Sequence, residues 1–321
     1  MSIYLGGGTP SLWRADCIAA AIARIRERFA GPGELEVTLE ANPTDCHSEN
    51  LAAWRAAGIN RLSIGVQSLA PRELVVLGRD HRFGDGRAAV ERAIAAGFAT
   101  SVDFILGVPG SAGAPEIDLG PGPGGALAPD HLSMYELTIE ERTSFGQRVR
   151  DGRMVPWSED ALTELYTATH DRLTAAGYEH YEISSYARPG KRAVHNTLYW
   201  RGAAFLGLGV GAASLEIDPD GAGRRPTNPR RAADYLASPG AAAEVIASTA
   251  AEMAADRAWL GLRTSDGIAE ADLAGAPGVA DFLVAERLAE RRGGRICPTL
   301  RGFLMADRIA ARVVETWSAR L

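Results

Sequence analysis

The chain has 321 residues, of which 46% are hydrophobic, so it can bury one large core or a core with a smaller appended domain. Its formal charge of −6, from 40 acidic and 34 basic side chains without a Lys/Arg-rich stretch, argues against nucleic acid as the main partner. Three widely spaced cysteines exclude a disulfide framework and no apolar run could span a membrane, so the sequence predicts a cytoplasmic protein.

Short apolar runs alternate with longer helical stretches over the first two-thirds of the chain. This repeat of strand, helix and strand predicts an α/β fold, with a parallel sheet covered by helices as in a (β/α) barrel. Each predicted helix ends near a glycine that suits a C-cap. We expect strands at residues 3–5, 35–39, 62–66, 102–106 and 131–137, and helices at 15–29, 49–57 and 87–96.

The crossover between Val108 and His131 does not fit this pattern. Parallel strands need a connection of about a dozen residues or more, usually a helix. Residues 110–125 instead hold six glycines and three prolines, which disfavour a helix. A local frameshift and an ordinary flexible loop are both open interpretations.

The rest of the chain predicts one long helix and then a separate domain. Ser158 is a candidate N-cap for a helix that runs to about Ala176, and residues 178–186 form another apolar stretch. Residues 218–230 are rich in Gly, Pro and Arg and predict a surface loop. The expected domains are a barrel core at 1–216, a linker at 217–245, and a mostly helical, winged-helix-like domain at 246–321 with a hairpin at G-G-R-I-C-P-T.

Unusual residues follow the predicted strands. Gly6, Gly7 and Gly8 permit positive φ values, while Glu40, Gln67 and Asp103 place polar groups near strand ends. Loops at the carboxyl ends of barrel strands build the active site, so these residues predict one ligand site. Taken singly, each could serve a tight turn or bond to neighbouring backbone.

Eight sequence blocks in a fixed order resemble the HemW branch of the radical S-adenosylmethionine proteins, which are relatives of oxygen-independent coproporphyrinogen III oxidase. The resemblance covers nearly the whole chain apart from the Gly/Pro segment, and it implies a partial radical SAM barrel with a HemN-like C-terminal domain. The blocks are I-Y-L-G-G-G-T-P-S-L-W, E-V-T-L-E-A-N-P-T, G-I-N-R-L-S-I-G-V-Q-S-L, L-G-R-D-H, S-V-D-F-I-L-G-V-P-G, H-L-S-M-Y-E-L-T-I-E, Y-E-I-S-S-Y-A-R-P-G and H-N-T-L-Y-W-R-G.

The resemblance implies an S-adenosylmethionine site. Gly7, Gly8 and Thr9 would contact the methionyl part of the ligand. The pocket would be lined by Glu40, Gln67, Arg79 and Asp103, with Tyr135 and Glu136 at its rim. Arg79 could pair with the ligand carboxylate. Its alternative role is a surface ion pair with Asp80 or Asp85.

The sequence departs from the family at the iron-sulfur cluster. The family holds a four-iron four-sulfur cluster through a C-x3-C-x2-C motif before the G-G-G-T-P strand. This sequence starts at that strand, so we expect its barrel to lack the first strand and the cluster loop. Cys17, Cys46 and Cys297 do not match the motif, and no metal ligands are expected in the chain.

His195 opens H-N-T-L-Y-W, which resembles a HemW segment associated with heme binding. Imidazole is an axial ligand of heme iron, and Tyr199 and Trp200 could stack on the porphyrin. Without the resemblance, His195 would be an ordinary surface or hydrogen-bonding histidine. His81 is the rival candidate, because it lies near the expected ligand pocket.

The resemblance therefore predicts a heme chaperone that delivers heme to acceptor proteins, with S-adenosylmethionine and the cluster in a supporting role. The alternative is an enzyme, oxygen-independent coproporphyrinogen III dehydrogenase, which would decarboxylate propionate side chains through a 5′-deoxyadenosyl radical. A third interpretation is a truncated open reading frame without activity.

Overall fold

The computed structural model describes residues 1–29, 31, 34–79, 84–111, 113 and 128–318. The chain divides into two compact units, Met1–His195 and Asn196–Leu321. The units meet between His195 and Asn196, earlier than the boundary expected at residue 216. Most of the Gly/Pro segment, and with it the choice between a frameshift and a loop at 110–125, lies outside the described residues. His81 lies outside them as well.

The first unit is built on a sheet with the strand order β1-β2-β3-β4-β5-β7-β6. Strands β1 to β5 pair in parallel, whereas β7 is antiparallel to both β5 and β6. The parallel α/β sheet predicted from the sequence is confirmed. The strands are β1 Ser2–Leu5, β2 Glu36–Ala41, β3 Arg61–Gln67, β4 Ala99–Leu106, β5 His131–Glu136, β6 Glu179–His180 and β7 Ser185–Ala187.

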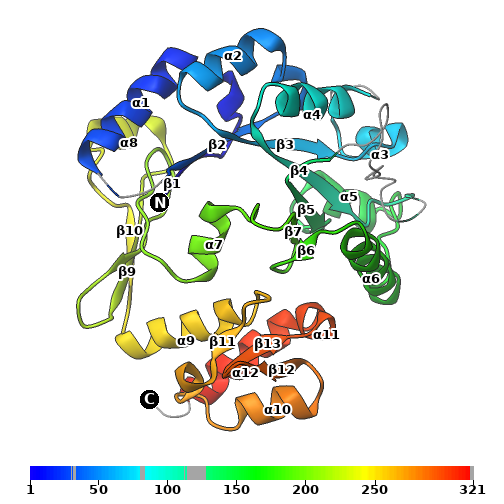
Figure 1. The fold of residues 1–321 in the computed structure, drawn as a ribbon, viewed down its shortest axis with the longest axis vertical. Coiled ribbons are helices and arrows are strands. Elements are labelled where there is room, and N and C mark those ends of the chain that lie inside the picture. Colours follow the sequence, from blue (N-terminus) through cyan, green and yellow to red (C-terminus); the bar gives the residue numbers. More distant parts are fainter. Residues whose placement is uncertain (30, 32–33, 80–83, 112, 114–127, 319–321) are drawn as a thin grey trace. The chain divides into compact units, whose positions relative to one another are not determined.

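Helices cover one face of this sheet. Figure 1 shows α1, α2 and α4 lying along that face. Side chains such as Val37, Leu39 and Leu62 are fully buried there in one core with Ile18 and Trp54 of the helices. Each such aliphatic side chain stabilises the fold by about 1.5–3 kcal/mol. The helical elements are η1 Pro10–Leu12, α1 Ala15–Arg28, η2 Pro43–Asp45, α2 Ser48–Ala56, α3 Pro71–Val76, α4 Asp85–Ala95, α5 Ser144–Arg150, α6 Glu159–Ala175 and α7 Val194–Trp200.

The long helix expected after Ser158 is α6. The Ser158 hydroxyl accepts the Ala161 N–H at 3.3 Å, so Ser158 is the N-cap. Leu165, Thr169 and Leu173 are buried along one face of the helix. The expected helix and its cap are thus confirmed.

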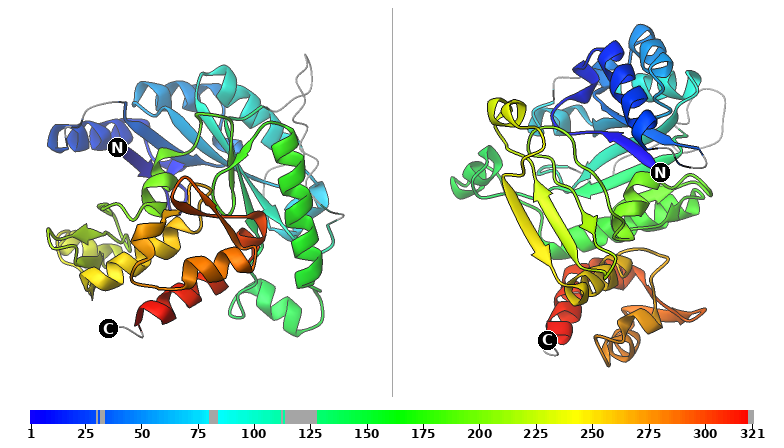
Figure 2. Two further views of the ribbon diagram at one scale, coloured as in Figure 1. Left: turned by 60° about the horizontal axis from the view of Figure 1, so that its bottom comes forward. Right: turned by 90° about the vertical axis from the view of Figure 1, so that its left-hand side faces the viewer.

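The second unit contains an antiparallel sheet that the sequence did not predict. Its strands are β8 Glu216–Ile217, β9 Gly223–Thr227 and β10 Glu244–Ser248, and they lie in the order β10-β9-β8 (yellow in Figure 2). Helix α8 Ala232–Ala237 connects β9 to β10 along the chain. The expectation of a loop at 218–230 is therefore wrong. Hydrogen bonds to both neighbours define β9, and Arg225 forms an ion pair with Asp256 at 2.6 Å.

The end of the chain packs helices around another small sheet, with the order β11-β13-β12. The turn Gly293–Gly294 joins β12 to β13, which confirms the predicted hairpin. The elements are α9 Ala250–Gly261, β11 Ile268–Ala269, η3 Glu270–Leu273, α10 Val279–Ala285, β12 Ala289–Arg292, β13 Arg295–Pro298, α11 Leu300–Leu304 and α12 Ala306–Ser318. In the described part of the chain, no helix has the length and apolar character needed to cross a membrane.

Candidate functional site

The sheet of the first unit has one apolar and one polar face. Side chains alternate along each strand, so residues two apart share a face. The face opposite the helices carries polar side chains from five parallel strands. They are Ser2, Tyr4, Glu36, Thr38, Glu40, Arg61, Ser63, Ser101, Asp103, His131, Ser133 and Tyr135. Bulky apolar residues dominate a packed barrel interior, so a polar face of this kind indicates a ligand site.

At the carboxyl ends of the strands, Glu40 joins the glycine loop to the sheet. Its Oε2 accepts the Gly7 N–H at 3.1 Å, and its Oε1 accepts the Tyr4 hydroxyl at 2.7 Å. Gly7 and Gly8 have φ values of 83° and 64°, in the left-handed region that favours glycine. The loop is exposed and its backbone open to a ligand.

Asp103 lies on the same face, deeper in the sheet. Its Oδ2 accepts the Ser63 hydroxyl at 2.9 Å, while its buried Oδ1 has no hydrogen-bond partner among the described residues. Burial raises the pKa of Asp103 to about 6, although the neighbouring hydroxyls of Ser133 and Ser63 act in the opposite direction. The charge of Glu40 also raises this pKa, so the two carboxyls interact.

Gln67 ends β3 in a strained backbone conformation. Its φ is 65°, a value that few residues other than glycine adopt, and the register between β3 and β4 shifts between Ile64 and Gln67. A Cβ on Gly65 would lie 2.8 Å from the Gln67 Nε2, so this glycine leaves room for the Gln67 side chain. Irregular strand ends of this type are common beside active sites.

Tyr135 and Glu136 fall on different faces of β5. Tyr135 shares the polar face, where burial and the neighbouring Asp103 raise its pKa to about 12. Glu136 instead lines a cavity of about 90 Å³ beside α6, together with Leu106, Leu162 and Tyr166. The structure therefore does not bring Glu136 to the other predicted residues.

Two further predicted residues, Thr9 and Arg79, are exposed. Thr9 is exposed, and its carbonyl accepts the Leu12 N–H at 3.1 Å at the start of η1. Arg79 is exposed just after α3, and its backbone N–H is bonded to the Leu74 carbonyl. Asp80, one of its two predicted alternative partners, is not among the described residues, whereas the other, Asp85, begins α4.

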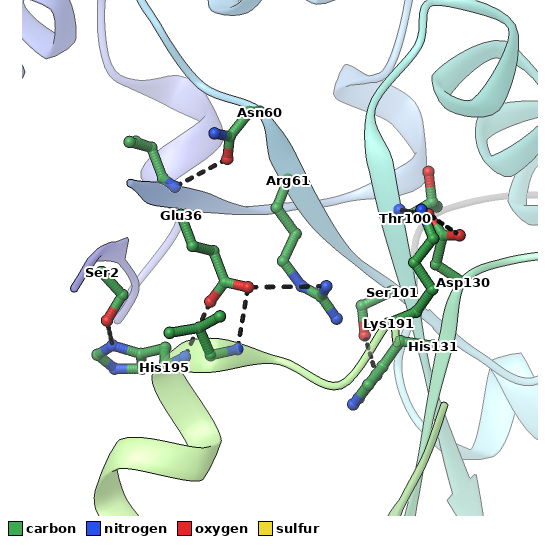
Figure 3. Close-up of polar contacts among 12 residues, drawn as sticks. Ser2, Glu36, Asn60, Arg61, Thr100, Ser101, Asp130, His131, Lys191 and His195 are labelled. Carbon is green, nitrogen blue, oxygen red and sulfur yellow. Dashed lines mark hydrogen bonds and ion pairs between the residues drawn. The ribbon is translucent and has the colours of Figure 1, made fainter. Parts of the chain in front are cut away.

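His195 lies at the opposite, amino-terminal end of the strands. Its Nδ1 is 3.0 Å from the Ser2 hydroxyl, and its ring stacks on Tyr4 with centroids 4.5 Å apart. Glu36 accepts the backbone N–H groups of Val194 and His195 at 3.0 and 2.9 Å, which holds the start of α7 (Figure 3). Burial lowers the pKa of His195, an effect that Glu36 partly offsets.

Buried polar and charged side chains contact one another at this end of the sheet. Arg61 faces Glu36 at 3.8 Å with only 5% of its side chain exposed. The His131 ring bridges the hydroxyls of Ser101 and Tyr181 at 2.7 and 2.8 Å. Burial holds the pKa of His131 well below its usual value, and the charge of Arg61 acts in the same direction.

Sequence reasoning missed Tyr4, Arg61 and His131 as parts of the polar face, and it missed Tyr181, which is bonded to His131. The signal was present in the strands themselves, where polar and apolar residues alternate in S-I-Y-L, R-L-S-I, S-V-D-F and H-L-S-M-Y. Tyr199 and Trp200, the expected porphyrin-stacking residues, lie at the end of α7. The Tyr199 ring meets Phe205 edge to face at 4.6 Å.

The sequence is similar to that of known proteins. A sequence model of the radical SAM superfamily matches residues 2–113. The chain is 35% identical over 317 residues to the heme chaperone HemW of Mycobacterium tuberculosis H37Rv, covering 96% of this chain and 79% of that protein. It is 36% identical over 237 residues to the heme chaperone HemW of Escherichia coli, covering 73% and 61% respectively.

The fold is also found in a solved structure. Coproporphyrinogen III oxidase (HemN) of Escherichia coli, a radical SAM enzyme, matches with a TM-score of 0.75 over 97% of this chain and 77% of that chain. The sequence identity is 21%, so this likeness shows the fold alone.

The radical SAM superfamily implies S-adenosylmethionine and a four-iron four-sulfur cluster. The described residues do not fit the cluster. Cys17 is exposed, whereas Cys46 and Cys297 are buried in different units. No three His, Cys, Asp or Glu side chains converge as metal ligands in the described ranges. S-adenosylmethionine fits better, because Glu40 and the orphan Oδ1 of Asp103 offer acceptors for its ammonium and hydroxyl groups.

Proposed function

Since the chain belongs to the HemW family of radical S-adenosylmethionine proteins, we propose that it is a heme chaperone, which binds heme and delivers it to heme-accepting proteins in the cytoplasm. The identities of 35% and 36% to HemW relatives favour this function over that of a coproporphyrinogen oxidase, for which the support is a fold likeness at 21% identity. The observation that carries the proposal is the anchoring of His195.

The surroundings of His195 suit an axial ligand. Ser2 engages Nδ1, so its hydroxyl would fix the orientation of the ring when the imidazole binds iron. The lowered pKa keeps the imidazole neutral near pH 7, which is the form that binds iron. Heme bound there would supply an iron centre, and neutral imidazole is one of its common axial ligands.

We also propose that S-adenosylmethionine binds at the carboxyl ends of the strands, where Gly7, Gly8, Glu40, Gln67 and Asp103 form what we call the carboxyl-end cluster. Gly7, Gly8 and Thr9 would contact its methionyl part, and Glu40 would accept from its ammonium group. The contact between Glu40 and Gly7 supports this role. A ribose hydroxyl would donate to the orphan Oδ1 of Asp103, which is costly to leave buried without a partner. Gln67, Arg79 and Tyr135 complete the proposed pocket.

Heme titration followed by the Soret band tests the chaperone proposal. His195→Ala should weaken heme binding by more than about tenfold. Mutation of a residue that is merely hydrogen-bonded to a metal ligand typically lowers metal affinity by about 10–100-fold, and loss of the ligand itself should cost at least as much. His47→Ala removes an exposed histidine and is the matched control, and His81→Ala tests the rival ligand. All titrations include a competing heme scavenger at matched protein concentration.

The outcomes test separately whether His195 is the axial ligand and whether the chain is a heme chaperone. Unchanged affinity in His195→Ala would remove His195 as an axial ligand. If neither the wild type nor any variant binds heme above the scavenger background, the chaperone proposal fails for this chain.

A further inference from the structure

Tyr4 contacts both proposed ligand sites, although they lie at opposite ends of the strands. We propose that Tyr4 is a positioning residue that couples Glu40, in the S-adenosylmethionine pocket, to the orientation of the His195 imidazole. The roles of the two sites rest on the proposed function. The coupling itself concerns only three side chains of the first unit.

The hydroxyl end of Tyr4 contacts the carboxyl-end cluster. It donates to Glu40 Oε1 at 2.7 Å, while the other oxygen of Glu40 accepts the Gly7 N–H. Burial and the adjacent Glu40 hold the pKa of Tyr4 far above its usual value, so the hydroxyl remains a donor throughout the working pH range. A ligand ammonium that binds Glu40 would compete directly with this bond.

The ring of Tyr4 belongs to the His195 site. The two rings are 16° from parallel with centroids 4.5 Å apart, which is a stacked contact. Ser2, two residues before Tyr4 on the same face of β1, bonds to the Nδ1 of His195. One short strand therefore holds both the edge and the face of the imidazole.

Little space remains for Tyr4 to move independently of these neighbours. A Cβ on Gly6 would lie 2.6 Å from the Tyr4 ring and 3.1 Å from Glu40 Oε1. The Gly6 backbone and the His195 ring thus both lie close to the Tyr4 ring. A displacement of the hydroxyl with Glu40 must tilt the ring, and the stacked imidazole must follow.

Coupling of this kind is reciprocal. If S-adenosylmethionine changes the affinity for heme, heme changes the affinity for S-adenosylmethionine by the same factor. A chain of contacts alone does not demonstrate such coupling, so it has to be measured with a double-mutant cycle.

The first experiment uses the ligand-free chain. Long-range ¹H–¹⁵N spectra report the His195 ring, whose signals are assigned by their loss in His195→Ala. Glu40→Gln should shift these signals when Tyr4 is present and leave them unmoved in the Tyr4→Phe background, which retains the ring and lacks the hydroxyl. Tyr178→Phe is the matched control, since it removes a buried hydroxyl bonded to the Pro129 carbonyl at 2.8 Å. An equal shift in the two backgrounds overturns the proposal.

The second experiment measures heme affinity with and without S-adenosylmethionine. The ratio of the two affinities should be at least about fivefold, as is typical of coupled sites, and should approach one in Tyr4→Phe. A ratio of one in the wild type, or the same ratio in Tyr4→Phe, contradicts the coupling. Coupling in the spectra without heme binding would refute the chaperone function alone. Heme binding at His195 without coupling in the spectra would refute the role of Tyr4 alone.

Discussion

The buried carboxyl of Asp103 is expected to lower the stability of the fold and to strengthen ligand binding. Its pKa of about 6 in the folded chain lies above the ordinary value of 3.8. Such a group lowers stability above pH 6, and this cost disappears as the pH falls from 6 to 3.8. Asp103→Asn should therefore raise the free energy of unfolding at pH 7.5 by about 1–3 kcal/mol while it weakens S-adenosylmethionine binding.

Urea denaturation at pH 7.5 and pH 4.5, combined with calorimetric titration of S-adenosylmethionine, measures both effects of Asp103→Asn. The gain in stability should shrink at the lower pH. Asp160→Asn, at an exposed position of α6, should change the unfolding free energy by less than about 0.5 kcal/mol. A loss of stability in Asp103→Asn at pH 7.5 would mean that the carboxylate is well compensated in the fold.

Individual residues of the site could be predicted from the sequence where local rules suffice. The three glycines after β1 permit positive φ values, and Gly7 and Gly8 adopt them. The role proposed for Tyr4 could not be predicted, because it depends on Glu40 in the neighbouring strand and on His195, near the end of the first unit. Such contacts depend on sheet register, which no short segment encodes by itself.

At the scale of elements, hydrophobic periodicity predicted the helices and strands that bury one apolar face in the core. Strands β2, β3 and β4 contain fully buried side chains, and α6 has a clear cap and a buried stripe. Strands β9 and β10 were missed for the opposite reason. β10 is exposed at four of its five positions, and the sequence of β9, G-R-R-P-T, has the composition of a loop. Their pairing with each other defines them.

Helix α9 offers a test of local capping. The Thr249 hydroxyl accepts the Glu252 N–H at 3.2 Å, and the Glu252 carboxylate accepts the Thr249 N–H at 2.7 Å, so the two residues form a capping box. Thr249→Ala should lower the unfolding free energy of the second unit by about 1 kcal/mol. Thr249→Ser keeps the hydroxyl and should remain close to the wild type. Chemical denaturation compares the three proteins, and equal losses in both variants would show that the hydroxyl does not cap α9.

At the scale of the whole molecule, the sequence predicted a barrel core at 1–216, a linker at 217–245 and a smaller domain at 246–321, whereas the two compact units are Met1–His195 and Asn196–Leu321. The position of the division could not be predicted. Helix α7, Val194–Trp200, contains the last two residues of the first unit and continues into the second. The division therefore falls within a helix, where no change in composition marks it.

The first unit contains four histidines whose neutral form is favoured by the fold. Burial lowers the pKa values of His131, His170, His180 and His195, and that of His180 falls to about 3. In the unfolded chain these histidines bind protons near pH 6.5, whereas in the folded chain they bind protons only at lower pH. Stability from these groups is complete above pH 6.5 and is lost progressively as the pH falls towards the folded values.

Two carboxyls oppose this trend. The pKa values of Asp103 and Glu182 are raised by burial, so they favour the folded chain as the pH falls, but they are outnumbered by the four histidines. We expect the unfolding free energy to decrease between pH 6.5 and pH 4.5. His180 alone should account for about 1.4 kcal/mol per pH unit, because one pKa unit corresponds to that energy.

Urea denaturation followed by circular dichroism at pH 7.5, 6.0, 5.0 and 4.5 measures the slope of stability against pH. His180→Phe can retain the stacking of the His180 ring on Tyr186, where the centroids are 4.1 Å apart, and it removes the titrating group. The variant should therefore show a shallower slope even if its stability at pH 7.5 is lower. An unchanged slope in His180→Phe would mean that His180 takes up its proton in the folded chain as readily as in the unfolded one, and that its buried bonds to Tyr166 and His170 rearrange to admit the charge.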